Sequence, residues 1–488
     1  MHLGVFEVLG PQVGGTLSWP HPRSAGANFT SLEHWVHLAQ VIDRAGFTFL
    51  FLADTFGYPT ADGELAETAA ARGINFPTLD PAVVVTALAR ETERLGFVVT
   101  SPTGLDHPVQ TARRFATLDH FTEGRIGWNI VTGSAQDVVA ELFGHDEMVL
   151  HDERYAMADE YVDTALNLWE GSWEDDALVV DRAAGLYADP AKIHRVSFAG
   201  RWFRSSGYFA SPPSPQRTPV LFQAGTSERG RAFAARNAEA VFVQATTMDA
   251  TAQAVADIRA EVAAHGRDPQ SVTTIIGVTV VVAPTHAEAV ARRREFEALQ
   301  SDEIVAALYS HNTGIDLLSL DPDGTLEQVL GRGAAGQTGQ TNITRFTGGD
   351  GEPAKTVREV LDALRGRGTR GFAITGDPVE VADGLERILD ATDLDGFMLE
   401  PVFAPRDVED FVELVVPVLR ERGRLPQVPT TGTLREQLSG RGSAHLAADH
   451  PGASRRARPG GAEPARTTAS APAPAGPPRQ RTTPGSDR

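Results

Sequence analysis

Short apolar runs alternate with amphipathic stretches along most of the chain. The apolar runs are rich in β-branched and aromatic residues and lack a clean period of two, which is typical of parallel strands buried on both faces. Eight runs are predicted as strands: 3–9, 49–54, 97–103, 126–132, 220–225, 240–245, 274–283 and 396–402. Helical patterns cover 31–45, 81–95, 112–120, 153–170, 228–237, 250–265, 286–299 and 408–422. This alternation predicts an α/β fold, a (β/α)8 TIM barrel, with a doubly wound sheet as the alternative.

Three segments interrupt the alternation and are predicted as insertions: 57–78, 171–219 and 300–375. The stretch at about 331–351 is dense in Gly, Gln and Thr, and we expect a mobile flap there because it can bury little apolar surface. Residues 1–440 are therefore predicted as one barrel domain. Residues 441–488 consist mainly of Ala, Pro, Gly, Arg, Ser and Thr, and are predicted as a disordered low-complexity tail.

The charge distribution argues against nucleic acid as a partner. The chain of 488 residues carries a net charge of −20, and its last 48 residues hold eight Arg against three Asp or Glu. Residues 1–440 thus carry −25, which disfavours contact with phosphate backbones. The sequence has no cysteine, no apolar run of about 18 residues and no basic segment ahead of an N-terminal apolar run. We therefore expect a cytoplasmic enzyme without a membrane segment.

Candidate chemistry gathers where the predicted strands end, which is where TIM barrels place their active sites. Asp54, Thr100, Asn129 and Ser227 all follow or end such strands. Gly225-Thr226-Ser227 opens a helix, so its free N–H groups and the helix dipole favour a phosphate, although an ordinary helix cap is the alternative. His34 and His37 lie three residues apart, but no HExxH motif and no third ligand accompany them, so no metal site is predicted.

Several motifs resemble one family. Residues 112–132 read ARRFATLDH…GR.GWN.VT, and further blocks follow in family order: HDERY at 151–155, SWEDDA at 172–177, YADPAK at 187–192, FQAGTS at 222–227, DGFML at 395–399 and GTLRE at 432–436. Together they make the chain similar to the FMN-dependent two-component monooxygenases of the luciferase-like superfamily. The branch indicated contains the nitrilotriacetate, dibenzothiophene sulfone and pristinamycin monooxygenases.

The resemblance implies a cofactor, a partner and a set of site residues. Enzymes of this family use reduced FMN, supplied by diffusion from a separate NAD(P)H:FMN reductase, and O2 to oxygenate a small organic molecule. By position in the motifs, five residues are expected to contact FMN around its phosphate: Asp54, Thr100, His151, Tyr155 and Ser227.

The resemblance also points to two candidate catalytic histidines. His311 matches a family position near the reactive side of the flavin, and His107 follows the third strand. Either could donate or remove a proton near neutral pH, while a loop histidine without a chemical role is the alternative. The turn 10–13, Gly-Pro-Gln-Val, departs from many relatives at a position that borders their substrate pocket. The substrate is therefore left open.

A homodimer or higher homo-oligomer is implied as well, with Phe115 and Leu118 beside Trp128 as a candidate contact face. Three other functions stay open: a deazaflavin-dependent oxidoreductase of the same superfamily, a non-catalytic flavin-binding barrel, and a flavin-independent hydrolase. The sequence shows no paired carboxylates or metal ligands of the kind a hydrolase would use, which argues against the last of these. The G-x-G-x-x-G at 331–336 follows a helical run, not a strand, so it does not predict a nicotinamide site.

Overall fold

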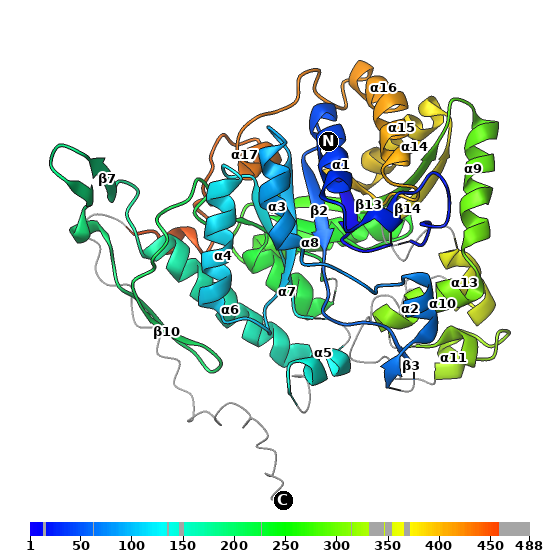
Figure 1. The fold of residues 1–488 in the computed structure, drawn as a ribbon, viewed down its shortest axis with the longest axis horizontal. Helices are drawn as coiled ribbons and strands as arrows, with labels where there is room; N and C mark the ends of the chain where they lie inside the picture. The colour runs from blue at the N-terminus through cyan, green and yellow to red at the C-terminus, as the bar shows by residue number, and fades with distance from the viewer. Residues whose placement is uncertain are drawn as a thin grey trace, which may run out of the picture.

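The computed structural model describes residues 1–12, 16–61, 63–133, 136–145, 151–225, 227–313, 315–330, 346, 354–365 and 371–457. The flap predicted at about 331–351 lies outside these residues except for Phe346. The nine-stranded main sheet and its surrounding helices dominate the view in Figure 1.

Eight parallel strands form a closed barrel, as predicted, and each coincides with one of the predicted strands. They follow the order β1-β2-β5-β6-β11-β12-β13-β15, after which β15 pairs again with β1. Their bounds are β1 His2–Val8, β2 Phe49–Ala53, β5 Gly96–Pro102, β6 Ile126–Val131, β11 Val220–Gln223, β12 Ala240–Val243, β13 Thr273–Val282 and β15 Gly396–Leu399. Closure leaves no free edge and brings every strand's carboxyl end to one mouth.

The long strand β13 closes the barrel and then leaves it. Its first residues pair with β12 and with β15, up to Val278 opposite Leu399. Since β15 ends there, the remaining half of β13 pairs with an additional strand, β14 (Phe372–Gly376). This ninth strand was not predicted, because four of its five residues lie inside the segment taken as an insertion.

Helices surround the barrel, and all eight predicted helical segments contain one. They are α1 Leu32–Ala45, α3 Pro81–Arg90, α4 Pro108–Phe121, α6 His151–Gly171, α7 Glu228–Asn237, α8 Met248–Ala264, α9 His286–Leu299, α15 Arg406–Leu414 and α16 Val416–Glu421. The last predicted helix is divided into α15 and α16, because Pro417 cannot donate a backbone hydrogen bond. A further helix, α14 (Pro378–Thr392), follows β14 and was not predicted.

The remaining elements belong to the connecting segments. Short helices lie on the mouth side in the lower part of Figure 1: α2 Glu67–Arg72, α5 Gln136–Leu142, α10 Asp302–Thr313, α11 Leu326–Leu330 and α13 Val357–Leu364. Three hairpins complete them: β3 Thr60–Ala61 with β4 Glu64–Leu65, β7 Leu178–Asp181 with β8 Leu186–Ala188, and β9 Val196–Ala199 with β10 Arg204–Gly207.

A short helix, α17 (Leu434–Ser439), plugs the amino-terminal end of the barrel. Leu434 and Leu438 join the apolar cluster that fills the barrel interior. A Cβ added to Gly96, where β5 begins, would lie 2.5 Å from a methyl carbon of Leu434, so the helix sits directly against the strand starts. With this end filled by side chains, the opposite mouth is the end available for a ligand.

Residues 441–457 pack against the barrel helices, so the prediction of a disordered tail starting at 441 is wrong for this segment, which we call the strap. Leu446 and His450 are buried. Arg456 binds the fully buried Glu170 of α6 at 2.9 Å, and Arg455 binds Asp163 of α6 at 2.6 Å. The strap is held mainly by arginine–carboxylate pairs, which leave no apolar pattern in its sequence. Residues 458–488 lie outside the described part of the chain.

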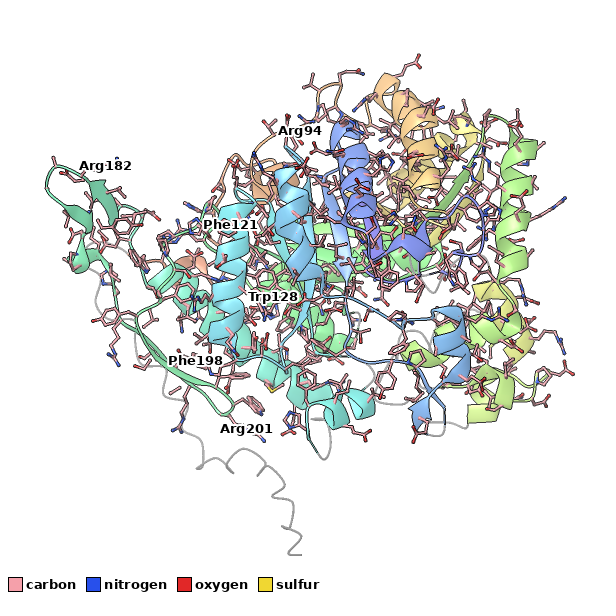
Figure 2. All side chains as sticks on the ribbon, in the orientation of Figure 1. Arg94, Phe121, Trp128, Arg182, Phe198 and Arg201 are labelled. Carbon is pink, nitrogen blue, oxygen red and sulfur yellow. The ribbon has the colours of Figure 1, made fainter. Side chains whose placement is uncertain are left out.

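The proposed contact face for a dimer is also wrong. Phe115 and Trp128 are fully buried and Leu118 is 5% exposed, so they belong to the core. Figure 2 places Trp128 within the body of the molecule and Arg182 at the outer end of the β7–β8 arm. That arm carries apolar side chains that are 40–69% exposed: Leu178, Val179, Val180, Leu186 and Tyr187.

Within the described residues, no helix combines the length and apolar content needed to cross a bilayer.

We predict that the strap contributes to folding stability. Truncation after Gly440 should lower the free energy of unfolding by roughly 3 kcal/mol or more, because the buried Leu446 and the ion pairs of Arg455 and Arg456 are lost together, while Arg217 still faces Glu170 at 3.6 Å. Truncation after Ala457 keeps these contacts and should leave it unchanged. Urea unfolding of both truncations and the full chain measures the difference. Equal stability of all three proteins would show that the strap contacts are dispensable.

Candidate active site

Two polar side chains inside the barrel mouth form one hydrogen-bonded pair. Thr100 of β5 lies opposite Asn129 of β6 in the sheet register. The Asn129 amide nitrogen donates to the Thr100 hydroxyl at 2.9 Å. Asn129 is only 4% exposed, and within the described part of the chain its Oδ1 accepts no hydrogen bond. A buried, unused acceptor at the mouth of a barrel indicates a place for a ligand donor.

Tyr155 and Ser227 meet above the amino terminus of α7. Ser227 is the N-cap of α7, and its hydroxyl accepts from the Gly230 N–H at 3.1 Å. The buried Tyr155 hydroxyl hydrogen-bonds with Ser227 and Gln223. Burial raises the pKa of the Tyr155 phenol, so the hydroxyl keeps its proton and can donate.

Glycine makes this close approach feasible. A Cβ added to Gly225 or to Gly230 would lie 2.5 or 2.8 Å from the Tyr155 hydroxyl oxygen. Any side chain there would displace the tyrosine. The result is a cradle of hydroxyls and backbone N–H groups at a helix amino terminus, which we call the α7 cradle and which suits an anionic group.

Asp54 lies elsewhere on the mouth, directly after β2. Strands β5 and β6 separate β2 from β11, which leads into α7, so the two sites are about 14 Å apart along the sheet. Burial raises the pKa of the Asp54 carboxyl to about 7, with the nearby Asp80 charge acting in the same direction and the Thr55 backbone hydrogen bond opposing both. The structure therefore brings Tyr155 and Ser227 together, pairs Thr100 with Asn129, and keeps Asp54 apart from the α7 cradle.

His107 has a clear structural role. It is the N-cap of α4, where its Nδ1 accepts from the Val109 N–H at 3.3 Å and Gln110 completes a capping box. The ring is exposed and contacts Phe203 edge-on at 5.9 Å. His151 is the first residue of α6, and His311 lies in the helix α10. The side chains of these last two residues lie outside the described structure.

Aromatic residues at the mouth were not identified from the sequence as a group. Phe56, after β2, contacts Phe143, after α5, edge-on at 5.3 Å. Because these segments follow β2 and β6, the pair spans the end of β5, which lies between them. Phe56 and Phe143 are 50% and 41% exposed, and they supply an apolar surface beside the polar mouth. Their positions in different connecting segments left no local pattern to detect.

The turn after β1 packs against the segment that follows β2. Gln12 accepts a hydrogen bond from the Asn75 N–H at 2.7 Å, and a Cβ added to Gly73 would lie 2.9 Å from Pro11. The turn 10–13 was singled out as a departure from the resembling family and 57–78 as an insertion, and the two segments meet in the structure. Among the residues that the structure describes, no group of three or more His, Cys, Asp or Glu could hold a metal ion.

Comparison with known proteins agrees with this architecture. The family profile "Luciferase-like monooxygenase" matches residues 12–393. The dimethyl-sulfide monooxygenase of Hyphomicrobium sulfonivorans is 38% identical over 456 residues, with 93% of each chain covered. The dibenzothiophene-sulfone monooxygenase of Rhodococcus erythropolis (strain XP) is 36% identical over 444 residues, covering 90% of this chain and 96% of the relative.

Among solved structures, a riboflavin lyase (RcaE), solved with modified FMN and the substrate riboflavin, superposes with a TM-score of 0.88. It is 42% identical, and the match covers 94% of this chain and 100% of that chain. The chain therefore belongs to the luciferase-like monooxygenase family, as the motifs indicated. Its named relatives, similar over most of their length, make it a monooxygenase.

The raised pKa of Asp54 predicts a specific pH dependence of stability. In the unfolded chain the carboxyl ionises around 3.8, whereas in the folded chain it stays protonated up to about pH 7. The wild-type protein should therefore lose stability relative to D54N as pH rises from about 4 to about 7, and level off above that. Urea unfolding of both proteins at pH 5 and pH 8 measures this. A constant difference between them at both pH values would contradict it.

Proposed function

We propose that this protein uses reduced FMN, delivered by a separate NAD(P)H:FMN reductase, and O2 to oxygenate a small organic substrate. The observation that carries the proposal is the α7 cradle, which lies at the mouth of a barrel whose family is that of luciferase-like monooxygenases. The modified FMN in the structure of the 42% identical riboflavin lyase supports the choice of cofactor.

The α7 cradle is the proposed site of the FMN phosphate. Ser227 and Tyr155 offer hydroxyls, and the first turn of α7 offers backbone N–H groups with the positive end of the helix dipole. The resemblance adds His151, which begins α6 four residues before Tyr155. An ionised Asp54 would repel a phosphate, so we assign Asp54 to the ring end of the flavin.

Thr100, Asn129 and Asp54 would then face the isoalloxazine ring. The Oδ1 of Asn129, which accepts no hydrogen bond from the described residues, can accept from a ring N–H, and Asp54 can donate while it is protonated. When bound, the reduced flavin supplies the chemistry that activates O2, while these residues orient the ring and limit water. His311 and His107 remain proposals as proton-transfer groups, and for His107 the role as N-cap of α4 competes with catalysis.

Riboflavin is a specific candidate substrate. The riboflavin lyase that superposes with a TM-score of 0.88 was solved with riboflavin as its substrate. The exposed Phe56 and Phe143 fit a planar aromatic molecule next to the mouth. Dimethyl sulfide and dibenzothiophene sulfone, the substrates in the names of two relatives, are the alternatives. A homo-oligomer stays proposed, with the apolar β7–β8 arm replacing the buried face as the surface to test by light scattering.

The two-component proposal predicts that turnover depends on a reductase. The protein with NADH, FMN, O2 and riboflavin should consume no NADH, and adding any NADH:FMN reductase should start substrate loss with incorporation of one oxygen atom from labelled O2. The panel also includes dimethyl sulfide and dibenzothiophene sulfone. NADH oxidation and product mass are followed together.

The S227A/Y155F variant tests the α7 cradle. It should lose activity at a low concentration of FMN and regain it at a high concentration, because only the affinity for FMN is reduced. Turnover without a reductase would overturn the two-component proposal. Turnover only with a reduced deazaflavin would identify the deazaflavin-dependent alternative. FMN binding without oxygenation of any compound in the panel would exclude riboflavin, dimethyl sulfide and dibenzothiophene sulfone as substrates.

A further inference from the structure

A ladder of alternating charges runs along the contact between α6 and α7. From the strap toward the α7 cradle its members are Arg455, Asp163, Arg236, Asp159 and Arg229. Arg455 and Arg236 both bind Asp163, at 2.6 and 2.9 Å. Arg236 also reaches Asp159 at 3.1 Å, and Asp159 is ion-paired in turn with Arg229.

Arg229 is the last member of the ladder and lies at the α7 cradle. It is the second residue of α7, after the N-cap Ser227 and Glu228. Its guanidinium lies 5.9 Å from the centre of the Tyr155 ring. Its side chain is 35% exposed, more than the other two arginines of the ladder, so it has access to solvent and to a ligand.

Asp159 can release Arg229 without becoming an unpaired carboxylate. Its other oxygen is bound by Arg236 at 3.1 Å, and the Asn237 amide nitrogen lies 3.4 Å from that oxygen. Loss of one of two cationic partners is much less costly than loss of the only partner of a half-buried charge. The ladder thus holds Arg229 in place but leaves it replaceable.

The mouth carries an independent sign that a ligand binds beside α7. Asn129, 4% exposed and with an unused Oδ1 in the described structure, lies on β6. Strand β6 pairs directly with β11, whose end leads into α7, and Asn129 lies opposite Phe222. An acceptor on β6 and a replaceable cation on α7 therefore lie on adjacent parts of the mouth, as the ring end and the phosphate end of one ligand require.

We propose that Arg229 is a phosphate-specificity residue that exchanges Asp159 for the phosphate when FMN binds. This inference rests on the proposed function. Arginine suits the exchange because its fork of donors pairs with a carboxylate or a phosphate in the same geometry. A phosphate carries more charge than the carboxylate it replaces, so the exchange favours binding. Riboflavin has no phosphate, and for it Arg229 stays with Asp159.

The exchange separates two chemically similar ligands. If riboflavin is the substrate, both it and FMN present the same ring to one barrel mouth. Arg229 then adds affinity for FMN alone, so FMN occupies the α7 cradle and riboflavin is left to the remainder of the mouth. The charge of Arg229 alone would then decide which of the two ligands binds in the α7 cradle.

The test compares dissociation constants for FMN and riboflavin, measured by fluorescence quenching on the full-length protein. R229Q should weaken FMN about tenfold or more, the usual effect of losing a hydrogen bond to a charged group, and leave riboflavin unchanged. R229K keeps the charge and should recover part of the loss. R195Q removes the same charge from the exposed Arg195, directly before β9, and is the matched control, expected to change neither constant.

D159N tests the exchange itself. Removing the competing carboxylate should tighten FMN several-fold, and this gain should disappear in R229Q/D159N, where there is no arginine to release. Equal gains with and without Arg229 would mean that Asp159 acts only by repulsion, and would overturn the exchange.

The remaining outcomes are also decisive. Unchanged FMN affinity in R229Q, or equal weakening of FMN and riboflavin, would overturn the specificity role while wild-type FMN binding leaves the proposed function intact. Absence of FMN binding by the wild-type protein would overturn both.

Discussion

Closure of the parallel sheet into a barrel places the candidate site residues and gives the molecule two different ends. A parallel strand needs hydrogen-bonding partners on both sides, and here the circle is completed because β13 pairs with both β12 and β15. Closure directs all eight strand ends, and the helices that follow them, to one mouth. Residues far apart in sequence, such as Thr100, Asn129 and Ser227, reach the same mouth for this reason alone.

The two ends of the barrel then take different roles. Leu434 and Leu438 of α17 fill the barrel interior where the strands begin, so a ligand can enter only from the mouth. At the mouth, the site depends on how α6 is set against α7, since Tyr155 comes from one helix and Ser227 from the other. That alignment is fixed by ionic contacts between the helices and by the strap, which binds α6 through Arg455 and Arg456.

The sequence predicted those features that leave a local pattern. Buried strands read as apolar runs, and the motif blocks identified the family and proposed Tyr155 and Ser227 as site residues, which the structure brings together. The sequence could not predict contacts between charged residues that lie far apart along the chain. The strap is the clearest case, because Arg456 pairs with Glu170, 286 residues earlier, and no apolar periodicity marks either residue. The capping role of His107 and the Phe56–Phe143 contact likewise depend on tertiary structure.

We propose that one FMN molecule spans the mouth from the α7 cradle to Asp54 and Asn129. A crystal structure of the protein soaked with FMN would locate it. We expect the phosphate at the amino terminus of α7, in contact with Ser227 and Tyr155, and the ring beside Asn129. A phosphate bound at any other strand end, or a ring that leaves Asn129 Oδ1 without a donor, would contradict it.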